Sequence, residues 1–118
     1  MPKPWKQNKK KEDLPSKGTF SVSDYFMAAE FGACVQIDLH GFTVDSAIHA
    51  IDQYLNKQFI AGERAVKIIH GRGTGILRNA VHKHLATIPF VEAFRDSLNP
   101  SETLGVTVVV LHDVHVRL

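Results

Sequence analysis

The chain has 118 residues, a single cysteine and a formal net charge of +2, which suits one domain whose core needs neither disulfides nor a structural metal. No apolar run approaches the roughly 18 residues that a membrane-spanning helix needs. The lysine-rich N-terminus is also not followed by the apolar segment of a signal peptide. We therefore expect a cytoplasmic protein without a membrane partner. The charge distribution excludes a strongly basic nucleic-acid clamp, because six lysines and two acids give residues 1–17 a charge of +4, whereas eight basic and ten acidic residues give the remainder −2.

The N-terminal residues 1–20 are predicted to form a basic disordered tail, because they offer too little apolar surface to offset the entropy of an ordered chain. Such a tail either solubilises the protein or attracts a polyanion, and its composition fits both roles. We expect residues 21–34 to form an ordered arm or short helix, in which Ser21 caps the first turn. The arm either docks on its own domain or binds a partner. The domain itself is expected to span residues 35–118.

Four strands and two helices are predicted in this domain. The segment Val35–His40 alternates apolar and polar residues, which indicates a strand with one exposed face. Thr43 caps the helix that follows, and Gly62 ends it. Gly75 opens a second helix, which Pro89 stops. The other strands are predicted at residues 65–70, 91–97 and 105–111, with a loop over residues 98–104 between the last two.

This order predicts an α/β fold, a two-layer β-α-β-α-β-β sandwich with a mixed four-stranded sheet. The first strand alternates instead of being apolar throughout, which is typical of a sheet with only one fully covered face. We therefore expect both helices on one face of the sheet and a partly open second face.

Three polar side chains are predicted at one edge of the sheet. The strand period of two places Asp38 and His40 on the same exposed face, about 6.6 Å apart along the strand, with or without a hydrogen bond between them. A right-handed crossover makes the next strand parallel to the first, which brings His70 near His40. An imidazole can accept or donate a proton at neutral pH, so these residues are candidate catalytic groups.

The loop after His70 has the features of a phosphate cradle. Alternating glycines let the backbone approach an anion closely, and the N-termini of both predicted helices attract negative charge. Arg72 can hold a phosphate bidentately, and Arg78 can add a second contact. The candidate phosphate-binding residues are Gly71, Arg72, Gly73, Thr74, Gly75 and Arg78.

A carboxylate, two imidazoles and a phosphate cradle are the groups that cleavage of a phosphodiester uses. RNA supplies its own 2′-hydroxyl as nucleophile and requires no metal, whereas DNA requires an activated water, for which Asp38 is a candidate to recruit Mg²⁺. No metal-binding residues are predicted, because the histidines lack a ligand-spaced pair on a helix and there is no second cysteine. The sequence alone assigns no role to His82.

Three strings in this order and spacing carry a family resemblance: Ile-Asp-Leu-His-Gly from Ile37, Ile-Ile-His-Gly-Arg-Gly-Thr-Gly from Ile68, and Gly-Val-Thr-Val-Val-Val-Leu from Gly105. Together they resemble the small MutS-related (Smr) domain family, over about residues 35–111. The resemblance implies a fold like the C-terminal domain of a bacterial translation initiation factor. It also implies a nucleic-acid endonuclease that nicks DNA or cuts RNA, with the ribosome as a further candidate partner.

The family's D-x-H motif falls on Asp38 and His40, and its H-G-x-G motif on His70, Gly71 and Gly73. On this basis we expect His40 to be the general base, Asp38 to orient it and His70 to be the general acid, with the acid and base assignments interchangeable. The loop at residues 99–104 lacks the glycines frequent in the family. We expect a stand-alone, monomeric member. The rival hypothesis is a non-catalytic module that binds nucleic acid or the ribosome through the same phosphate cradle.

Overall fold

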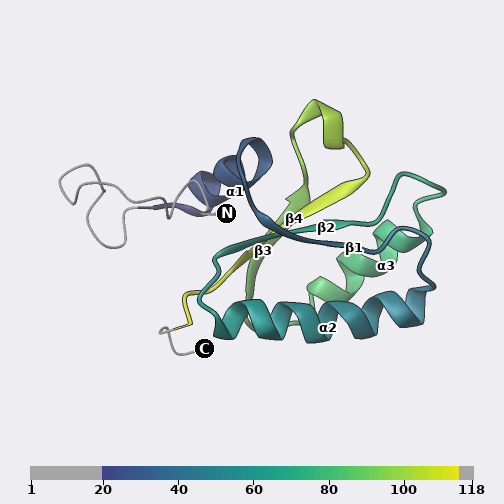
Figure 1. Ribbon diagram of the computed structural model, residues 1–118, viewed down its shortest axis with the longest axis horizontal. Coiled ribbons are helices and arrows are strands. Elements are labelled where there is room, and N and C mark those ends of the chain that lie inside the picture. Colours follow the sequence, from purple (N-terminus) through teal and green to yellow (C-terminus); the bar gives the residue numbers. More distant parts are fainter. Residues whose placement is uncertain (1–19, 115–118) are drawn as a thin grey trace.

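The computed structural model describes residues 20–114 (Figure 1), so most of the predicted basic tail lies outside the described residues. The predicted order of strands and helices is confirmed. A helix also lies within residues 21–34, where the sequence indicates an ordered arm or short helix, and a short 3-10 helix precedes the last strand. The elements are α1 (Val22–Phe31), β1 (Val35–Asp38), α2 (Val44–Ile60), β2 (Ala65–Ile69), α3 (Ile76–Leu85), β3 (Val91–Asp96), the 3-10 helix η3 (Pro100–Glu102) and β4 (Val106–Leu111).

The four strands form one mixed sheet, as predicted, and the structure gives their order as β1-β2-β4-β3. Strands β1 and β2 are parallel, with Asp38 opposite Ile69, and β4 runs antiparallel to both of its neighbours. Because the parallel pair ends at the same edge, the segments that follow Asp38 and Ile69 lie side by side there. This edge is where the sequence predicts the site.

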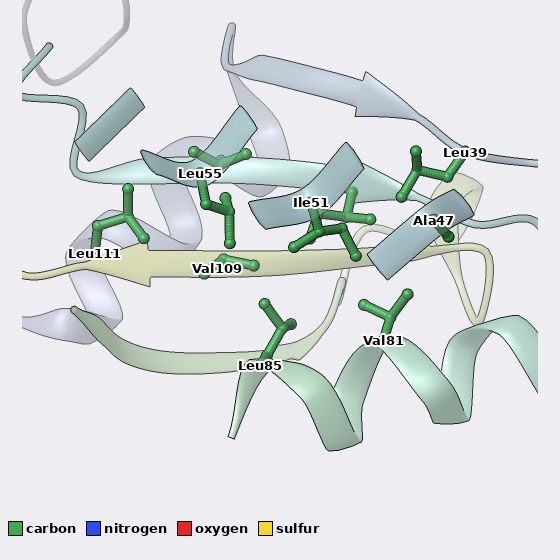
Figure 2. Close-up of a cluster of buried hydrophobic side chains, with 10 residues drawn as sticks. Leu39, Ala47, Ile51, Leu55, Val81, Leu85, Val109 and Leu111 are labelled. Carbon is green, nitrogen blue, oxygen red and sulfur yellow. The ribbon is translucent and has the colours of Figure 1, made fainter. Parts of the chain in front are cut away.

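Helices α2 and α3 cover one face of the sheet (Figure 1), and the main core lies between them and the strands (Figure 2). Thr43 caps α2 by accepting the backbone N–H of Ser46 at 3.1 Å, as predicted, and Gly62 follows the helix in a left-handed conformation with φ +85°. The core residues are Leu39, Ala47, Ile51, Leu55, Val66, Ile68, Val81, Leu85, Val109 and Leu111.

The second face of the sheet is less open than the sequence suggests, because α1 packs on it. Tyr25, Phe26 and Ala29 of this helix bury Ala65 of β2 together with Val108 and Val110 of β4. Ser21 and Asp24 form a capping box at its start. Of the two alternatives for the arm, the structure therefore shows docking on its own domain.

A buried carboxylate fastens α1 to the sheet. The Glu30 side chain is fully buried, and its two oxygens accept hydrogen bonds at 2.8 and 3.0 Å from the guanidinium of Arg95 on β3. The backbone N–H of Leu98 donates to the same carboxylate at 3.1 Å. Such full satisfaction is what a buried charge needs to be tolerated.

Two element ends differ from the prediction. Strand β1 ends at Asp38, which leaves His40 in the turn that follows. Helix α3 ends at Leu85, one turn earlier than Pro89 predicts. The Thr87 hydroxyl donates a hydrogen bond to the carbonyl of His84 just after this end. The residue before a proline also disfavours the helical conformation. Within residues 20–114, no helix combines the length and apolar character needed to cross a bilayer.

Candidate functional site

The end of β1 holds Asp38 and His40 as an exposed, hydrogen-bonded pair. Oδ1 of Asp38 accepts the backbone N–H of His40 at 3.1 Å and lies 2.7 Å from Nδ1 of its imidazole. The side chains are 52% and 72% exposed, respectively. Hydrogen bonds from the imidazole, and then from the backbone of His40, lower the pKa of the Asp38 carboxyl. The carboxylate thus holds a proton on Nδ1 and leaves Nε2 without a partner among the described residues.

A hollow of about 360 Å³ lies beside this pair, between the loops that lead into α2 and α3. Gly41, the neighbour of His40 in the chain, lies on one wall and Gly71 on the other. A Cβ placed on Gly71 would lie 3.4 Å from Cβ of His40, so the glycine loop passes close to the catalytic candidate. Residues 41–44 and 70–78 form the lining, and neither Asp38 nor His40 belongs to it.

The glycine loop is built as the sequence predicts. Gly71 and Gly75 have φ values of +81° and +86°, the left-handed region in which only glycine is unstrained, and Gly75 is the N-cap of α3. Thr43 caps α2 on the opposite wall. Two helix N-termini therefore border one hollow, an arrangement that favours a phosphate or another anion.

The two arginines of the predicted cradle differ in their environment. Arg72 is exposed and donates from Nε to the carbonyl of Thr103 at 2.9 Å, which holds its side chain against the loop before β4. Arg78 forms a two-pronged ion pair with Asp96 of β3, with nitrogen to oxygen distances of 2.8 and 2.5 Å. This pairing raises the pKa of Arg78 and lowers that of Asp96. The positive charge of Arg78 is therefore largely neutralised by Asp96 within the protein.

His70 reaches the same edge of the sheet, but its imidazole does not join the Asp38–His40 pair. The residue is 4% exposed. Its Nδ1 lies 3.0 Å from the carbonyl of Gly71, and its Nε2 lies 2.9 Å from the hydroxyl of Thr107 on β4. Both ring nitrogens are thus occupied inside the protein. The expectation that His70 lies near His40 holds for the backbone and not for the reactive atoms.

Sequence reasoning missed a polar chain behind His70. The Thr107 hydroxyl also lies 2.8 Å from Nε2 of His82 on α3, and this nitrogen is 3.5 Å from a carboxylate oxygen of Asp96. Burial lowers the pKa of both histidines, so both are neutral at pH 7. The available signal was Thr107 itself, the polar residue in the otherwise aliphatic run from Val106 to Leu111.

This chain contains a donor set of a kind that metals accept. Ligand atoms of His70, His82 and Asp96 all lie within 4.8 Å of one another, and two imidazoles with a carboxylate can bind zinc. The guanidinium of Arg78 already occupies both oxygens of Asp96, so a cation there would face a fixed positive charge. We therefore interpret the cluster as a hydrogen-bonded network.

Comparison with known proteins identifies relatives over the same region. The family model of the Smr domain matches residues 37–112. The proteins called Endonuclease MutS2 are similar: that of Lachnospira eligens is 37% identical over 101 residues, which cover 86% of this chain and 13% of that protein. The corresponding protein of Caldicellulosiruptor bescii is 46% identical over 79 residues, 67% of this chain and 10% of that one. The chain thus spans only about a tenth of the length of these relatives.

Solved structures agree with the fold. The crystal structure of the Smr domain of Thermus thermophilus MutS2 matches with a TM-score of 0.64 and 39% identity, over 66% of this chain and 98% of that one. YdaL, a stand-alone small MutS-related protein from Escherichia coli, matches with a TM-score of 0.63 over 67% of this chain and 65% of that one, and at 24% identity it supports the fold alone.

Proposed function

Because the chain belongs to the Smr domain family, we propose that it is a nucleic-acid endonuclease with His40 as the general base. The observation that carries the proposal is the exposed hydrogen bond between Asp38 and His40, 2.7 Å long, beside a hollow bordered by two helix N-termini. The name Endonuclease MutS2 of its relatives supports the same activity, although this chain corresponds to a small part of them.

The proposed reaction begins with a phosphate in the hollow. The glycine loop and Arg72 hold it, and Asp38 keeps Nδ1 of His40 protonated so that Nε2 takes the proton of the nucleophile. With RNA the nucleophile is the 2′-hydroxyl: its oxygen bonds to phosphorus, the bond from phosphorus to the 5′-oxygen breaks, and water returns a proton to the leaving oxygen. The products are a 2′,3′-cyclic phosphate and a 5′-hydroxyl.

The structure supports a different role for His70 from the general acid expected above. A general acid must reach the leaving oxygen within hydrogen-bond distance, whereas both ring nitrogens of His70 have partners within the protein, Gly71 and Thr107. We propose that His70 is a positioning residue, which holds the carbonyl of Gly71 and with it the start of the glycine loop. The acid function then falls to solvent.

The test is cleavage of an end-labelled single-stranded RNA in EDTA, with and without substitution of Asp38→Ala and His40→Ala. The matched control is Glu92→Gln with His112→Gln, because these side chains form an acid and imidazole pair, 3.7 Å apart, at the opposite end of the sheet. We expect cleavage by the wild type and the control variant, and none by the double alanine variant. Equal cleavage by all three proteins would exclude the mechanism. The same three proteins are tested in parallel for cleavage of a DNA substrate in the presence of Mg²⁺.

One observation favours the rival, a binding module without catalysis: Asp38 and His40 do not line the hollow. A pure binder would lose affinity with Arg72→Ala and would tolerate loss of Asp38, which adds only negative charge near a phosphate. An endonuclease binds substrate after Asp38→Ala but fails to cut it. Binding and cleavage measured on the same two variants therefore separate the two functions.

A further inference from the structure

We propose that the hollow binds an unpaired nucleotide, with its base stacked on Phe42, and that the protein therefore prefers single-stranded nucleic acid. This inference rests on the proposed function, because it names the substrate of the same site. It concerns the half of the hollow that a phosphate does not need.

That half is apolar and exposed. Phe42 and Ile76, which are 44% and 65% exposed, lie on opposite walls together with Val44. Phe42 comes directly before Thr43, the N-cap of α2, where an apolar residue often packs on the first turn of its own helix. Much of the ring nevertheless remains in solvent. A phosphate alone gains nothing from these side chains, whereas a nucleotide presents a charged group and an apolar ring together.

The size of the hollow agrees with a single nucleotide. Its volume of about 360 Å³ falls at the lower end of the range for small-ligand sites, roughly 300–1,000 Å³. Its lining combines the glycine loop with Phe42. A base within a duplex is stacked and paired with its neighbours, so its face is not available to Phe42. An unpaired base has that face free.

The charges near the hollow also favour a single strand. Proteins that bind duplexes through the backbone use many lysines and arginines. Here Arg78 is neutralised by Asp96, which leaves Arg72 as the exposed arginine of the lining. With few phosphate contacts available, stacking supplies the rest of the affinity, as in proteins that bind single strands on aromatic platforms.

A second hollow continues the first along the surface. It has a volume of about 450 Å³, lies between α2 and α3, and shares Val44 with the first. Besides Val44, its lining consists of Ile48, Ala80, Lys83, His84 and Thr87. The next nucleotide of an extended strand fits this groove, with its phosphate near the Lys83 ammonium. A strand thus follows a path from the glycine loop to the space between the two helices.

The experiment measures binding of fluorescein-labelled oligonucleotides by anisotropy, with no cleavage required. The probes share one sequence: a 2′-O-methyl RNA strand, a DNA strand, the DNA duplex, and a strand of the same charge without bases. We expect the better of the two single strands to bind about tenfold more tightly than the duplex or the abasic strand. Whichever backbone binds better identifies the substrate.

Matched variants test the two subsites. Phe42→Ala should weaken single-strand binding about tenfold and leave the abasic strand unaffected, while Phe42→Trp should retain binding. The control is Phe31→Ala, an exposed phenylalanine on α1 across the sheet. Lys83→Gln should weaken binding, whereas Lys57→Gln, near the C-terminal end of α2, should not. Circular dichroism verifies that each variant is folded.

Two results would overturn the inference: a duplex bound as tightly as a single strand, or equal affinities for Phe42→Ala and Phe31→Ala. If RNA is still cut in either case, the proposed function stands without the stacking site. If the predicted binding pattern appears and nothing is cut by the wild type, the stacking site stands and the endonuclease proposal fails.

Discussion

The hydroxyl of Thr107 lies 2.9 Å from Nε2 of His70, at the point where β4 passes the end of β2. The Gly71 carbonyl can only accept a hydrogen bond, so Nδ1 of His70 carries the ring proton and Nε2 accepts from Thr107. The Thr107 oxygen is then free to accept from Nε2 of His82, 2.8 Å away. One hydroxyl thus fixes the tautomers of two neutral histidines.

Replacing Thr107 by valine should destabilise the protein by roughly 1–3 kcal/mol, because Nε2 of His70 and Nε2 of His82 each lose a buried hydrogen-bond partner. Thr107→Ser keeps the hydroxyl and should cost less. Urea denaturation of the two variants and the wild type measures the difference. A valine variant as stable as the serine variant would show that the hydroxyl does not hold the chain together.

Stability should decrease as the pH falls below about 6.5, the unfolded-state pKa of histidine. Burial lowers the pKa of His70 and His82 in the folded state, so the unfolded state binds protons first on acidification, and the free energy of unfolding declines until the folded-state pKa is passed. Above this window the two residues contribute no pH dependence. The pKa values of Asp38 and Asp96 are also lowered in the folded state, so these two residues reduce stability in a separate window, as the pH falls below about 3.9.

The variant His82→Gln should flatten that pH dependence, since glutamine can donate to Thr107 without titrating. Thermal unfolding followed by circular dichroism between about pH 7.5 and about pH 5 is the measurement, and the window is set by the histidine pKa. The same slope in the variant and the wild type would show that His82 is not among the groups responsible.

The ion pair between Arg78 and Asp96 should appear as a coupling in stability. A double-mutant cycle with Arg78→Met and Asp96→Asn should give an interaction of about 1 kcal/mol, within the range for contacting partners. If Arg78 served mainly to hold phosphate, its replacement would weaken nucleic-acid binding and leave stability unchanged. Guanidinium chloride denaturation of the four proteins decides between these roles.

Glu30→Ala should be among the most damaging single changes outside the site. It leaves the Arg95 guanidinium, which is 32% exposed, and the backbone N–H of Leu98 without the carboxylate, for which about 1–3 kcal/mol is typical. The double variant Glu30→Ala with Arg95→Met should recover part of this loss, because no charge is then left unpaired. Calorimetric melting temperatures provide the comparison, and a double variant no better than Glu30→Ala would contradict the pairing argument.

Alanine at Gly71 or Gly62 should cost a similar stability, roughly 1–2 kcal/mol, because both glycines are left-handed. Only at Gly71 does the added methyl group meet the catalytic candidate, 3.4 Å from Cβ of His40, whereas nothing lies within 4 Å at Gly62. Cleavage by Gly71→Ala should therefore fall further than cleavage by Gly62→Ala. Equal rates for the two folded variants would show that the loop does not position His40.

The order of the elements and the edge of the sheet that holds the candidate site follow from local patterns. Alternation around Asp38 marks an exposed strand face, and Thr43, Gly62 and Gly75 mark helix ends by their own chemistry. The direction of a side chain beyond a strand end does not follow in this way. Strand alternation identifies Asp38 and His40 as neighbours, but their hydrogen bond depends on the turn that begins at His40.

The contacts that the sequence leaves open join distant elements. His82 meets Thr107 across 25 residues, and Glu30 meets Arg95 across 65. The second contact depends on how β3 aligns with β4, where Arg95 lies opposite Val108 and a bulge between Val91 and Ala93 shifts the register. A one-residue change of this register would send Arg95 to the other face of the sheet, and no local pattern specifies which register is adopted.

The docking of α1 determines where this module can be cut for transfer into other proteins. The family match begins at residue 37, but the second face of the sheet of this chain is covered by a helix that begins at Val22. A graft that starts at the family boundary would carry a bare aliphatic strip formed by Ala65, Val108 and Val110, which invites self-association. In this protein the smallest portable unit therefore begins near Ser21, with the helix as an integral lining of the sheet.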